Sequence, residues 1–459
     1  LIHPEEEAPA SLSLEEEAEQ AEAAQLVRDF NAMAERLQSM TREREFWNAA
    51  IAHELRTPVT ILRGRLQGLA EGVFSPSSEL FEGLLRQVEG LNHLIEDLRV
   101  LSLNDSGHLE VQRVSVRLAD ELVRHHLQDH GDWPRALVVD LWGSATMRTA
   151  GEEFAMALHL LGARPVWDEG SSRVSGVEIL PVAELDRPRL DVTLRVSGLF
   201  RDVFPQLCVL FGQAVTALTA RDEAPDWNPF VGRKGARVYG PAPGSYGLGM
   251  GAVSADLTEA ARQEAGRAWL AASSHALDTG RYDPEGIKAR VAGADVFVHL
   301  QDLPETDLLL AQDYAAHEAG FAAAQALTGG KAALYHLDAT RPDRPHARPL
   351  TEEIARVVRA RAANPKWIAG MMQHGFRGGA EIAATLDHLA AFAHLAQAVP
   401  PQLFDLYHDA TLGTADVRDF LARENPEALA AMEERFAALR AAGLWATRRN
   451  SILAGLEHG

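Results

Sequence analysis

Cysteine, long apolar runs and positive charge are all scarce in this chain of 459 residues. Cys208 is the only cysteine, which excludes an intramolecular disulfide framework and a CxxC metal site. It lies in an apolar run, so we expect a buried, unreactive thiol. No segment approaches the roughly 18–20 uninterrupted apolar residues of a membrane-spanning helix, and no signal peptide is visible.

The negative net charge argues against some classes of binding partner. A formal net charge of −21 argues against binding to nucleic acid or to anionic lipid, since both require positive charge. The length allows two or more domains with sizeable cores. The chain begins at Leu1 rather than at methionine, so we expect an upstream part to be absent. Residues 1–20 are rich in Glu and Ala, which predicts a disordered, acidic start. We expect a cytoplasmic protein.

From about residue 15 to residue 101, apolar residues recur at helical spacing. One stripe is Leu26, Phe30, Met33 and Leu37, and after a break at residues 72–78 a second stripe begins at Leu80. The pattern predicts two helices joined as an antiparallel hairpin. One hairpin cannot bury its wide apolar face alone, so we expect a homodimeric four-helix bundle.

The residue types of the segment His-Glu-Leu-Arg-Thr-Pro at residues 53–58 suit phosphoryl transfer to a histidine. A His53 ring nitrogen on the solvent face could attack a γ-phosphoryl group, while Glu54 accepts the proton of the other nitrogen. Thr57 could position a water for the reverse reaction, and Pro58 allows a bend just past His53. The alternative is a surface histidine on a coiled coil; the complete box after an apolar stripe favours a phosphoacceptor.

These motifs resemble those of sensor histidine kinases. Residues 21–44 resemble the last helix of a HAMP signalling module, and residues 45–110 resemble a dimerisation and phosphoacceptor (HisKA) domain. The resemblance implies a parent protein anchored in the inner membrane by a segment not present here. The Asp-x-Gly-x-Gly loop and the His-x-x-x-Asn motif of a kinase ATP-binding domain are both missing from the sequence. Phosphorylation of His53 would therefore require such a domain in trans, with a response regulator as the acceptor.

The character of the chain changes after a junction at residues 111–125. Short buried-type strands are predicted near residues 136–142, 162–167, 177–180 and 190–198, with a helix at 151–161 between the first two. From residue 257 onward the pattern is mostly helical, over 257–278, 284–293, 313–328, 351–362, 379–397, 415–422 and 426–442. This succession predicts a larger α/β region that is mostly helical. The fold class is thus mixed, a helical hairpin followed by an α/β region.

Long motifs at residues 142–149, 191–204, 237–247, 364–367 and 443–445 make residues 126–459 resemble the C-terminal part of the CobN-type large subunit of aerobic cobaltochelatase. That family is related to the H subunit of magnesium chelatase. The resemblance implies insertion of Co²⁺ into a tetrapyrrole, hydrogenobyrinic acid a,c-diamide, during cobalamin synthesis. It also implies AAA+ partner subunits that hydrolyse ATP. A His-Gly-x-Leu-Glu-Trp motif that the family carries upstream is missing from this sequence, so chelation by this chain alone is in doubt.

Four residues are candidate metal ligands: His299, Asp302, Asp313 and His317. Asp313 and His317 are spaced i, i+4, which places them on one face of a helix. Imidazole and oxygen ligands suit Co²⁺. The alternative, which we rank first, is a solvated acidic loop that leads into a helix on which His317 caps or packs.

A glycine-rich stretch offers a candidate tetrapyrrole site. The backbone at Gly244 and Gly247 could approach a flat macrocycle, Tyr239 and Tyr246 could stack on it, and Arg237 could lie beside it. A tight structural loop explains the same residues equally well.

Three interpretations follow from two signatures in one chain. The favoured one is a fragment of a CobN-type subunit joined to a phosphoacceptor hairpin, and incomplete for either activity alone. The second is a signalling protein phosphorylated on His53 in trans. The third is a chimera without a natural function as a unit, joined near residue 120.

Overall fold

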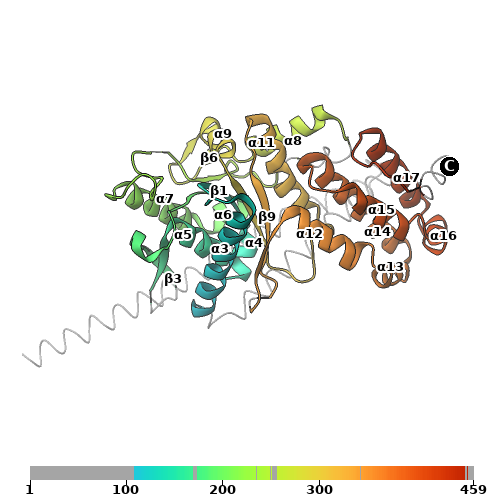
Figure 1. The fold of residues 1–459 in the computed structure, drawn as a ribbon, viewed down its shortest axis with the longest axis horizontal. Coiled ribbons are helices and arrows are strands. Elements are labelled where there is room, and N and C mark those ends of the chain that lie inside the picture. Colours follow the sequence, from blue (N-terminus) through green and yellow to red (C-terminus); the bar gives the residue numbers. More distant parts are fainter. Residues whose placement is uncertain are drawn as a thin grey trace, which may run out of the picture. The chain divides into compact units, whose positions relative to one another are not determined.

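The computed structural model describes residues 108–168, 173–233, 235–248, 250, 256–341, 343–449 and 452. The predicted hairpin and its His53 box lie outside these residues. The described part is an α/β fold built on one large sheet (Figure 1), as the strand pattern of residues 136–198 predicts.

An eight-stranded sheet has the order β10-β9-β8-β1-β4-β5-β6-β7. Strands β9, β8, β1, β4 and β5 are mutually parallel, while β10, β6 and β7 extend the two edges in antiparallel pairs. The strands are β1 (Ala136–Leu141), β4 (Asp191–Val196), β5 (Val238–Gly240), β6 (His275–Ala276), β7 (Arg281–Tyr282), β8 (Val296–Gln301), β9 (Ala333–Asp338) and β10 (His346–Pro349). A separate antiparallel pair joins β2 (Ala163–Asp168) to β3 (Arg173–Ile179).

Helices cover both faces of the sheet. Along β1, Leu137, Val139 and Leu141 belong to one core with α3 (His108–His130), α5 (Glu152–Leu161) and α7 (Pro205–Thr219). Val138 belongs to the other core, which includes α8 (Glu259–Ala271), α9 (Pro284–Ala292) and α11 (Gly320–Thr328). Burial on both faces explains why the central strands are almost continuously apolar, as parallel strands are.

Short helical segments complete the first half of the described chain. They are α4 (Gly143–Arg148), α6 (Gly198–Val203) and the 3₁₀ turn η1 (Val182–Glu184). Between β8 and α11, the segments α10 (Gln312–Tyr314) and η2 (Ala315–Ala319) form one continuous helical stretch, and η2 is a π-helix. This stretch with α11 corresponds to the single helix predicted over residues 313–328.

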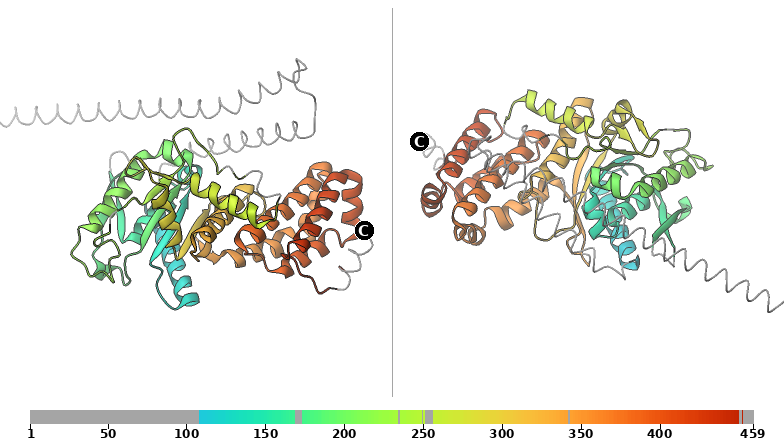
Figure 2. Two further views of the ribbon diagram at one scale, coloured as in Figure 1. Left: turned by 90° about the horizontal axis from the view of Figure 1, so that it is seen from above. Right: turned by 180° about the vertical axis from the view of Figure 1, so that it is seen from behind.

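A group of helices follows the last strand. They are α12 (Leu350–Val357), the π-helix η3 (Val358–Ala362), α13 (Pro365–Met372), α14 (Gly375–Ala391), the π-helix η4 (Phe392–Ala396), α15 (Pro401–Ala410), α16 (Ala415–Glu424) and α17 (Pro426–Ala441). Helices α13 to α17 stay together in every view (Figure 2), and α14 packs against α13, α16 and α17. Helices predicted for this region are confirmed, with longer extents for several. No helix within the described ranges is long and apolar enough to cross a membrane.

Five sheet strands after residue 257 were not expected from the sequence, among them the two-residue strands β6 and β7. β8 and β9 lie in the middle of the sheet and β10 at its edge, within a region whose pattern predicts mainly helices. Their apolar runs are short, and periodicity alone does not separate a short buried strand from a buried helical turn.

Candidate functional site

One side chain from each of five neighbouring strands lies in a single row across the sheet. The register pairs Asp140 of β1 with Arg195 of β4 and with His299 of β8; it also pairs His299 with His336 of β9, and Arg195 with Tyr239 of β5. Registered neighbours project from the same face of a sheet. All five residues are at most 2% exposed. We call these residues the polar row.

The polar row lies near the carboxyl ends of the parallel strands. From β1 the chain first builds the sheet outward through β4 and β5, and it later returns to add β8 and β9 on the other side of β1. Ligands of open α/β sheets bind at the carboxyl edge where the strand order reverses in this way. The fold therefore places the polar row next to the position where such a sheet offers a site.

The π-helix η2 packs over the polar row and pairs with it twice. His317 Nδ1 lies 2.7 Å from Asp140 Oδ2, and Glu318 Oε1 lies 2.8 Å from His336 Nδ1. The other ring nitrogen of His336 lies 3.0 Å from Gln301 Oε1. Consecutive residues of η2 thus reach different strands, and π-helical turns often occur at functional sites.

Asp140 is the hub of this cluster. Arg195 Nη1 donates to its Oδ1 at 3.1 Å, and the indole N–H of Trp142 donates to its Oδ2 at 2.8 Å. Burial alone would raise the pKa of Asp140, but the charges of His317 and Arg195 hold this pKa well below its ordinary value. Asp140 is therefore a carboxylate with every contact supplied by a donor.

Burial lowers the pKa of His317, an effect that Asp140 opposes and that Arg195 reinforces. The imidazole of His317 therefore loses its proton more readily than that of an ordinary histidine. By contrast, Glu318 raises the pKa of the fully buried His336 against the effect of burial. The pKa values of His317 on η2 and of His336 on β9 are therefore shifted in opposite directions.

His299 lies between His336 and Asp140 in the polar row and makes no hydrogen bond among the described residues. Its Nδ1 is 3.2 Å from Asp140 Oδ2, yet neither ring nitrogen has a hydrogen-bond partner among the residues that the structure describes. Its ring instead contacts those of Trp142 and Tyr314, with centroid separations of 4.6 and 5.4 Å.

A second charged group lies beside the polar row. Arg148 and Asp302 form a two-point ion pair with distances of 2.5 and 3.0 Å. Nearby, the buried Glu153 accepts hydrogen bonds from the hydroxyl groups of Thr146 and Thr149. Burial raises the pKa of Glu153 to about 7, and the charge of Asp302 adds to the effect. Glu153 therefore titrates in the neutral range.

The structure brings together two of the four candidate metal ligands. His299 and His317 both face Asp140, whereas Asp302 is paired with Arg148 and Asp313 is exposed. Within the described ranges, no group of three or more His, Cys, Asp or Glu side chains is arranged to hold a metal ion. The four-residue metal site stays a prediction from the sequence.

Residues of the glycine-rich stretch lie in two different environments. Arg237 is fully buried and bonds to Asp191 at 2.6 and 3.1 Å, and the buried Tyr239 donates its hydroxyl to Asp283 at 2.8 Å. Both side chains are thus occupied by internal partners.

Hydrogen bonds from the side chain of Arg201 stabilise the turn that follows. Gly244 and Gly247 adopt φ values of +75° and +74°, which favour glycine. The Arg201 guanidinium donates to backbone carbonyls of this turn, including that of Pro241 at 3.1 Å, and it lies 5.5 Å from the ring centre of Tyr246. Tyr246 is 52% exposed. Of the five residues predicted to bind the tetrapyrrole, it is therefore the one whose ring presents a large surface. Tetrapyrrole binding by these five residues stays a prediction.

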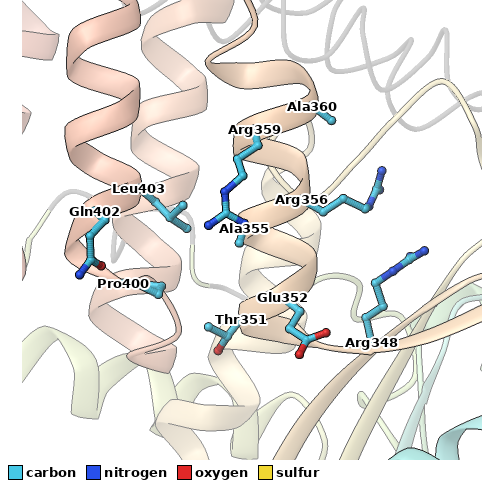
Figure 3. Close-up of a pocket in the computed structure, with 10 residues that line it drawn as sticks. All are labelled: Arg348, Thr351, Glu352, Ala355, Arg356, Arg359, Ala360, Pro400, Gln402 and Leu403. Atoms are coloured by element: carbon cyan, nitrogen blue, oxygen red, sulfur yellow. The ribbon is translucent and has the colours of Figure 1, made fainter.

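A separate hollow of about 860 Å³ lies between α12, η3 and α15. Figure 3 shows Arg359 on the side of the helix that faces Gln402, with Arg348 and Arg356 extending the other way. Both of the latter bond to the buried carboxylate of Glu353, which offsets much of their positive charge. The hollow is therefore a weak candidate for an anion site.

The predicted phosphoacceptor residues His53, Glu54 and Thr57 lie outside the described residues, and their role stays a prediction. Asp140 and Trp142 were missed by the sequence reasoning as site residues. Arg195, which belongs to the motif at residues 191–204, is buried against Asp140. The single cysteine is buried as expected, and burial raises the pKa of Cys208 to about 12.

Comparison with known proteins finds relatives for both parts of the chain. The family model described as "His Kinase A (phospho-acceptor) domain" matches residues 43–107, and that described as "CobN/Magnesium Chelatase" matches residues 111–452. The second match begins within α3, inside the junction expected at residues 111–125. The HisKA-like and the CobN-like residues therefore belong to two separate family matches, whereas the HAMP-like resemblance of residues 21–44 stays a prediction.

Curated relatives cover the C-terminal part. The aerobic cobaltochelatase CobN protein of Pseudomonas aeruginosa is 43% identical over 358 residues, which are 72% of this chain and 29% of that protein. The magnesium-chelatase H subunit of Cereibacter sphaeroides is 29% identical over 338 residues, 70% of this chain and 28% of that protein. The chain thus spans less than a third of the length of these relatives.

A solved structure agrees with these matches. The "Catalytic Subunit of Cobaltochelatase from Mycobacterium tuberculosis" superposes with a TM-score of 0.71 and 34% identity, over 76% of this chain and 31% of that one. The fold, the sequence identity and the family model agree over the described residues. The chain therefore belongs to the CobN/Magnesium Chelatase family.

Proposed function

We propose that residues 111–452 act as part of a cobaltochelatase large subunit. The proposed reaction is the ATP-dependent insertion of Co²⁺ into hydrogenobyrinic acid a,c-diamide, with ATP hydrolysed by AAA+ partner subunits. The observation that carries this proposal is the difference in identity, 43% to a CobN protein against 29% to a magnesium-chelatase H subunit. The substrate pair of the more similar relative is the better expectation for this chain.

The geometry is consistent with a supporting part rather than a complete enzyme. The polar row and η2 together offer a carboxylate, imidazole rings and a tyrosine ring at the carboxyl edge of the sheet, while Tyr246 offers an exposed ring elsewhere. The relatives are more than three times as long as their match to this chain. We therefore expect binding of tetrapyrrole and partner subunits, with insertion only when the remaining part of a large subunit is supplied.

Isothermal titration calorimetry of the full chain tests this proposal. Hydrogenobyrinic acid a,c-diamide and the AAA+ pair of an aerobic cobaltochelatase should each bind, and the AAA+ subunits of a magnesium chelatase should bind more weakly. Absence of heat with both the tetrapyrrole and the cobaltochelatase AAA+ pair, at high concentration, would overturn the proposal.

A matched pair of variants tests the glycine-rich turn. If Tyr246 stacks on the macrocycle, Tyr246→Ala should weaken tetrapyrrole binding about threefold to tenfold, the usual range for an aromatic contact. Tyr282→Ala removes another exposed tyrosine, 66% exposed on β7, and should leave the affinity unchanged. Equal affinities for all three proteins would remove the turn from the proposed site.

The match of residues 43–107 to the phosphoacceptor family supports a smaller, second proposal. We infer that His53 accepts phosphate from a kinase ATP-binding domain supplied in trans, on a hairpin that dimerises, and that a response regulator receives the phosphate. Incubation with labelled ATP and such a domain should label the wild-type chain but not His53→Gln. Equal labelling of the two proteins would contradict it.

A further inference from the structure

The ring of His317 is fixed by one nitrogen and leaves the other free. All its polar contacts use Nδ1, at 2.7 Å to Asp140, 3.0 Å to Arg195 and 3.1 Å to Trp142. Nε2 has no hydrogen-bond partner in the part of the chain that the structure describes, and it is not among the buried unpaired atoms there. The side chain keeps 11% exposure. Nε2 is therefore the atom that remains accessible.

The contacts also fix the tautomer. An ionised carboxylate only accepts hydrogen bonds, so the closest contact, from Nδ1 to Asp140, requires the proton on Nδ1. The indole N–H of Trp142 is shared between two acceptor positions and lies closer to Asp140 Oδ2, at 2.8 Å, than to His317 Nδ1, at 3.1 Å. The Arg195 guanidinium donates to the other oxygen, Oδ1. A neutral imidazole with its proton on Nδ1 carries a lone pair on Nε2. This arrangement of carboxylate, Nδ1–H and free Nε2 is the one that metal-binding histidines have.

The surroundings exclude a conventional ion site. Within the described ranges no group of three or more His, Cys, Asp or Glu side chains is arranged to hold a metal ion, and the permanent cation of Arg195 lies 3.0 Å from the His317 ring. Asp140 is already neutralised by that cation. A bare divalent ion would gain one ligand here, whereas protein sites for such metals normally supply three or four. A metal that reaches Nε2 must bring its other ligands with it.

We propose that Nε2 of His317 is an axial ligand for cobalt already held by a tetrapyrrole, with Asp140 as the positioning residue. This inference rests on the proposed function, since the ligand is the product of that reaction. A dative bond forms from Nε2 to cobalt and a water leaves the axial position; no electron is transferred and no proton is moved. The contact would retain the metallated macrocycle at the carboxyl edge of the sheet after insertion.

Electron paramagnetic resonance of the full chain with cob(II)inamide tests the bond directly. Cobalt(II) with one axial nitrogen shows superhyperfine splitting from that nucleus, and the pattern changes from three lines to two when the histidines are labelled with ¹⁵N. We expect this change in the wild-type chain. Absence of nitrogen splitting at saturating cob(II)inamide would overturn the inference without any variant that might misfold.

Substitutions identify the nitrogen. His317→Gln should abolish the splitting, whereas His346→Gln, at an exposed histidine of β10, should retain it. Asp140→Asn should retain the splitting but weaken binding about 10–100-fold, the usual effect of removing the carboxylate behind a ligating histidine. Unchanged splitting in His317→Gln, or unchanged affinity in Asp140→Asn, would contradict the assignment.

Two further arms separate this inference from the proposed function. Cobalt(II) chloride alone should show no nitrogen splitting at the same concentration; a split signal would contradict the requirement for a macrocycle. A chain that binds hydrogenobyrinic acid a,c-diamide in calorimetry but gives no splitting with cob(II)inamide would overturn the axial ligand only. A chain that binds neither the tetrapyrroles nor the AAA+ pair would overturn both proposals.

Discussion

Glu153 is a carboxyl group that the fold prefers in its neutral form. It is 1% exposed, and its two partners, Thr146 and Thr149, also donate to the backbone carbonyls of Trp142 and Ala145. Each threonine hydroxyl can therefore donate its hydrogen to a backbone carbonyl. The protonated carboxyl of Glu153 can then donate to the oxygen of one of these hydroxyls. The surroundings of Glu153 satisfy the neutral acid, and within the described part of the chain its side-chain partners are two threonine hydroxyls rather than a cation.

This protonation makes stability depend on pH. The folded pKa of about 7 exceeds the ordinary value of 4.5, so the folded state holds a proton that the unfolded state releases. The free energy of unfolding should fall as pH rises from 4.5 to 7. Glu153→Gln stays neutral, so its stability relative to wild type should rise over this window by about 3 kcal/mol. Urea unfolding at several pH values measures the difference.

Glu305→Gln is the matched control, because Glu305 is exposed in the loop after β8. Its stability relative to wild type should be the same at every pH. A Glu153→Gln curve parallel to that of wild type would show that Glu153 is ionised in the folded protein throughout.

The polar row shows what a sequence can reveal about single residues. A charged or imidazole side chain lies one or two residues before the last residue of β1, β4, β8 and β9. The other residues at these strand ends are mostly apolar: Val-Asp-Leu, Leu-Arg-Val, Val-His-Leu-Gln and Tyr-His-Leu-Asp. This repeated interruption was a usable signal for Asp140, Arg195 and His336. The pairing of His317 and Glu318 of η2 with the polar row could not be deduced from the sequence, because it depends on how the helix packs against the sheet.

At the scale of elements, the π-helix η2 changes the geometry that spacing alone predicts. Four residues separate Asp313 from His317, which in an α-helix would place both on one face. The π-turn widens the helix at Ala315–Ala319, and Asp313 faces solvent while His317 is buried. A π-turn has no sequence signature, so this departure could not have been predicted. The start of α13 could be predicted, because Asn364 and Pro365 are typical first residues of a helix.

Two asparagine caps of different burial give a prediction about helix stability. Asn364 caps α13 near solvent and accepts from Lys366 N at 2.9 Å. Asn425 caps α17 at 3% exposure; it accepts from Ala428 N and also donates to the Phe376 carbonyl, both at 3.0 Å. Asn364→Ala should cost about 1 kcal/mol. Asn425→Ala should cost about 2–4 kcal/mol, because a buried donor and acceptor lose their partner as well.

Urea denaturation of the two variants at one pH compares the costs. Both asparagines also donate to a backbone carbonyl, Asn364 to that of Ala360 near solvent and Asn425 to that of Phe376, each at 3.0 Å. The two substitutions are chemically identical, so the difference reports the burial of the cap and of this second hydrogen bond. Equal destabilisation would mean that the contact between Asn425 and Phe376 contributes nothing to the link between α14 and α17.

At the scale of the whole molecule, the C-terminal part is a compact unit of residues 104–168 and 172–459 with two apolar cores. Among the described residues, Val114 on α3 is the first that belongs to a core. The change of character near residue 120 was visible in the sequence. Its position was not, because α3 is a regular amphipathic helix that resembles the helices predicted before it, and only its packing against α5 and β10 assigns it to the second unit.

A chain that begins at residue 104 should therefore fold as well as the full chain. Its melting temperature should agree within about 2 °C, the shift that roughly 1 kcal/mol produces in a protein of this size. A chain that begins at residue 131 is the matched comparison. It lacks α3 and uncovers the side of the sheet and α5 against which Val114, Leu118 and Leu122 are buried. Each such side chain contributes about 1.5–3 kcal/mol, so this shorter chain should melt far lower or aggregate. Scanning calorimetry of the three proteins decides: equal melting of the two truncated chains would show that α3 belongs with the N-terminal part instead.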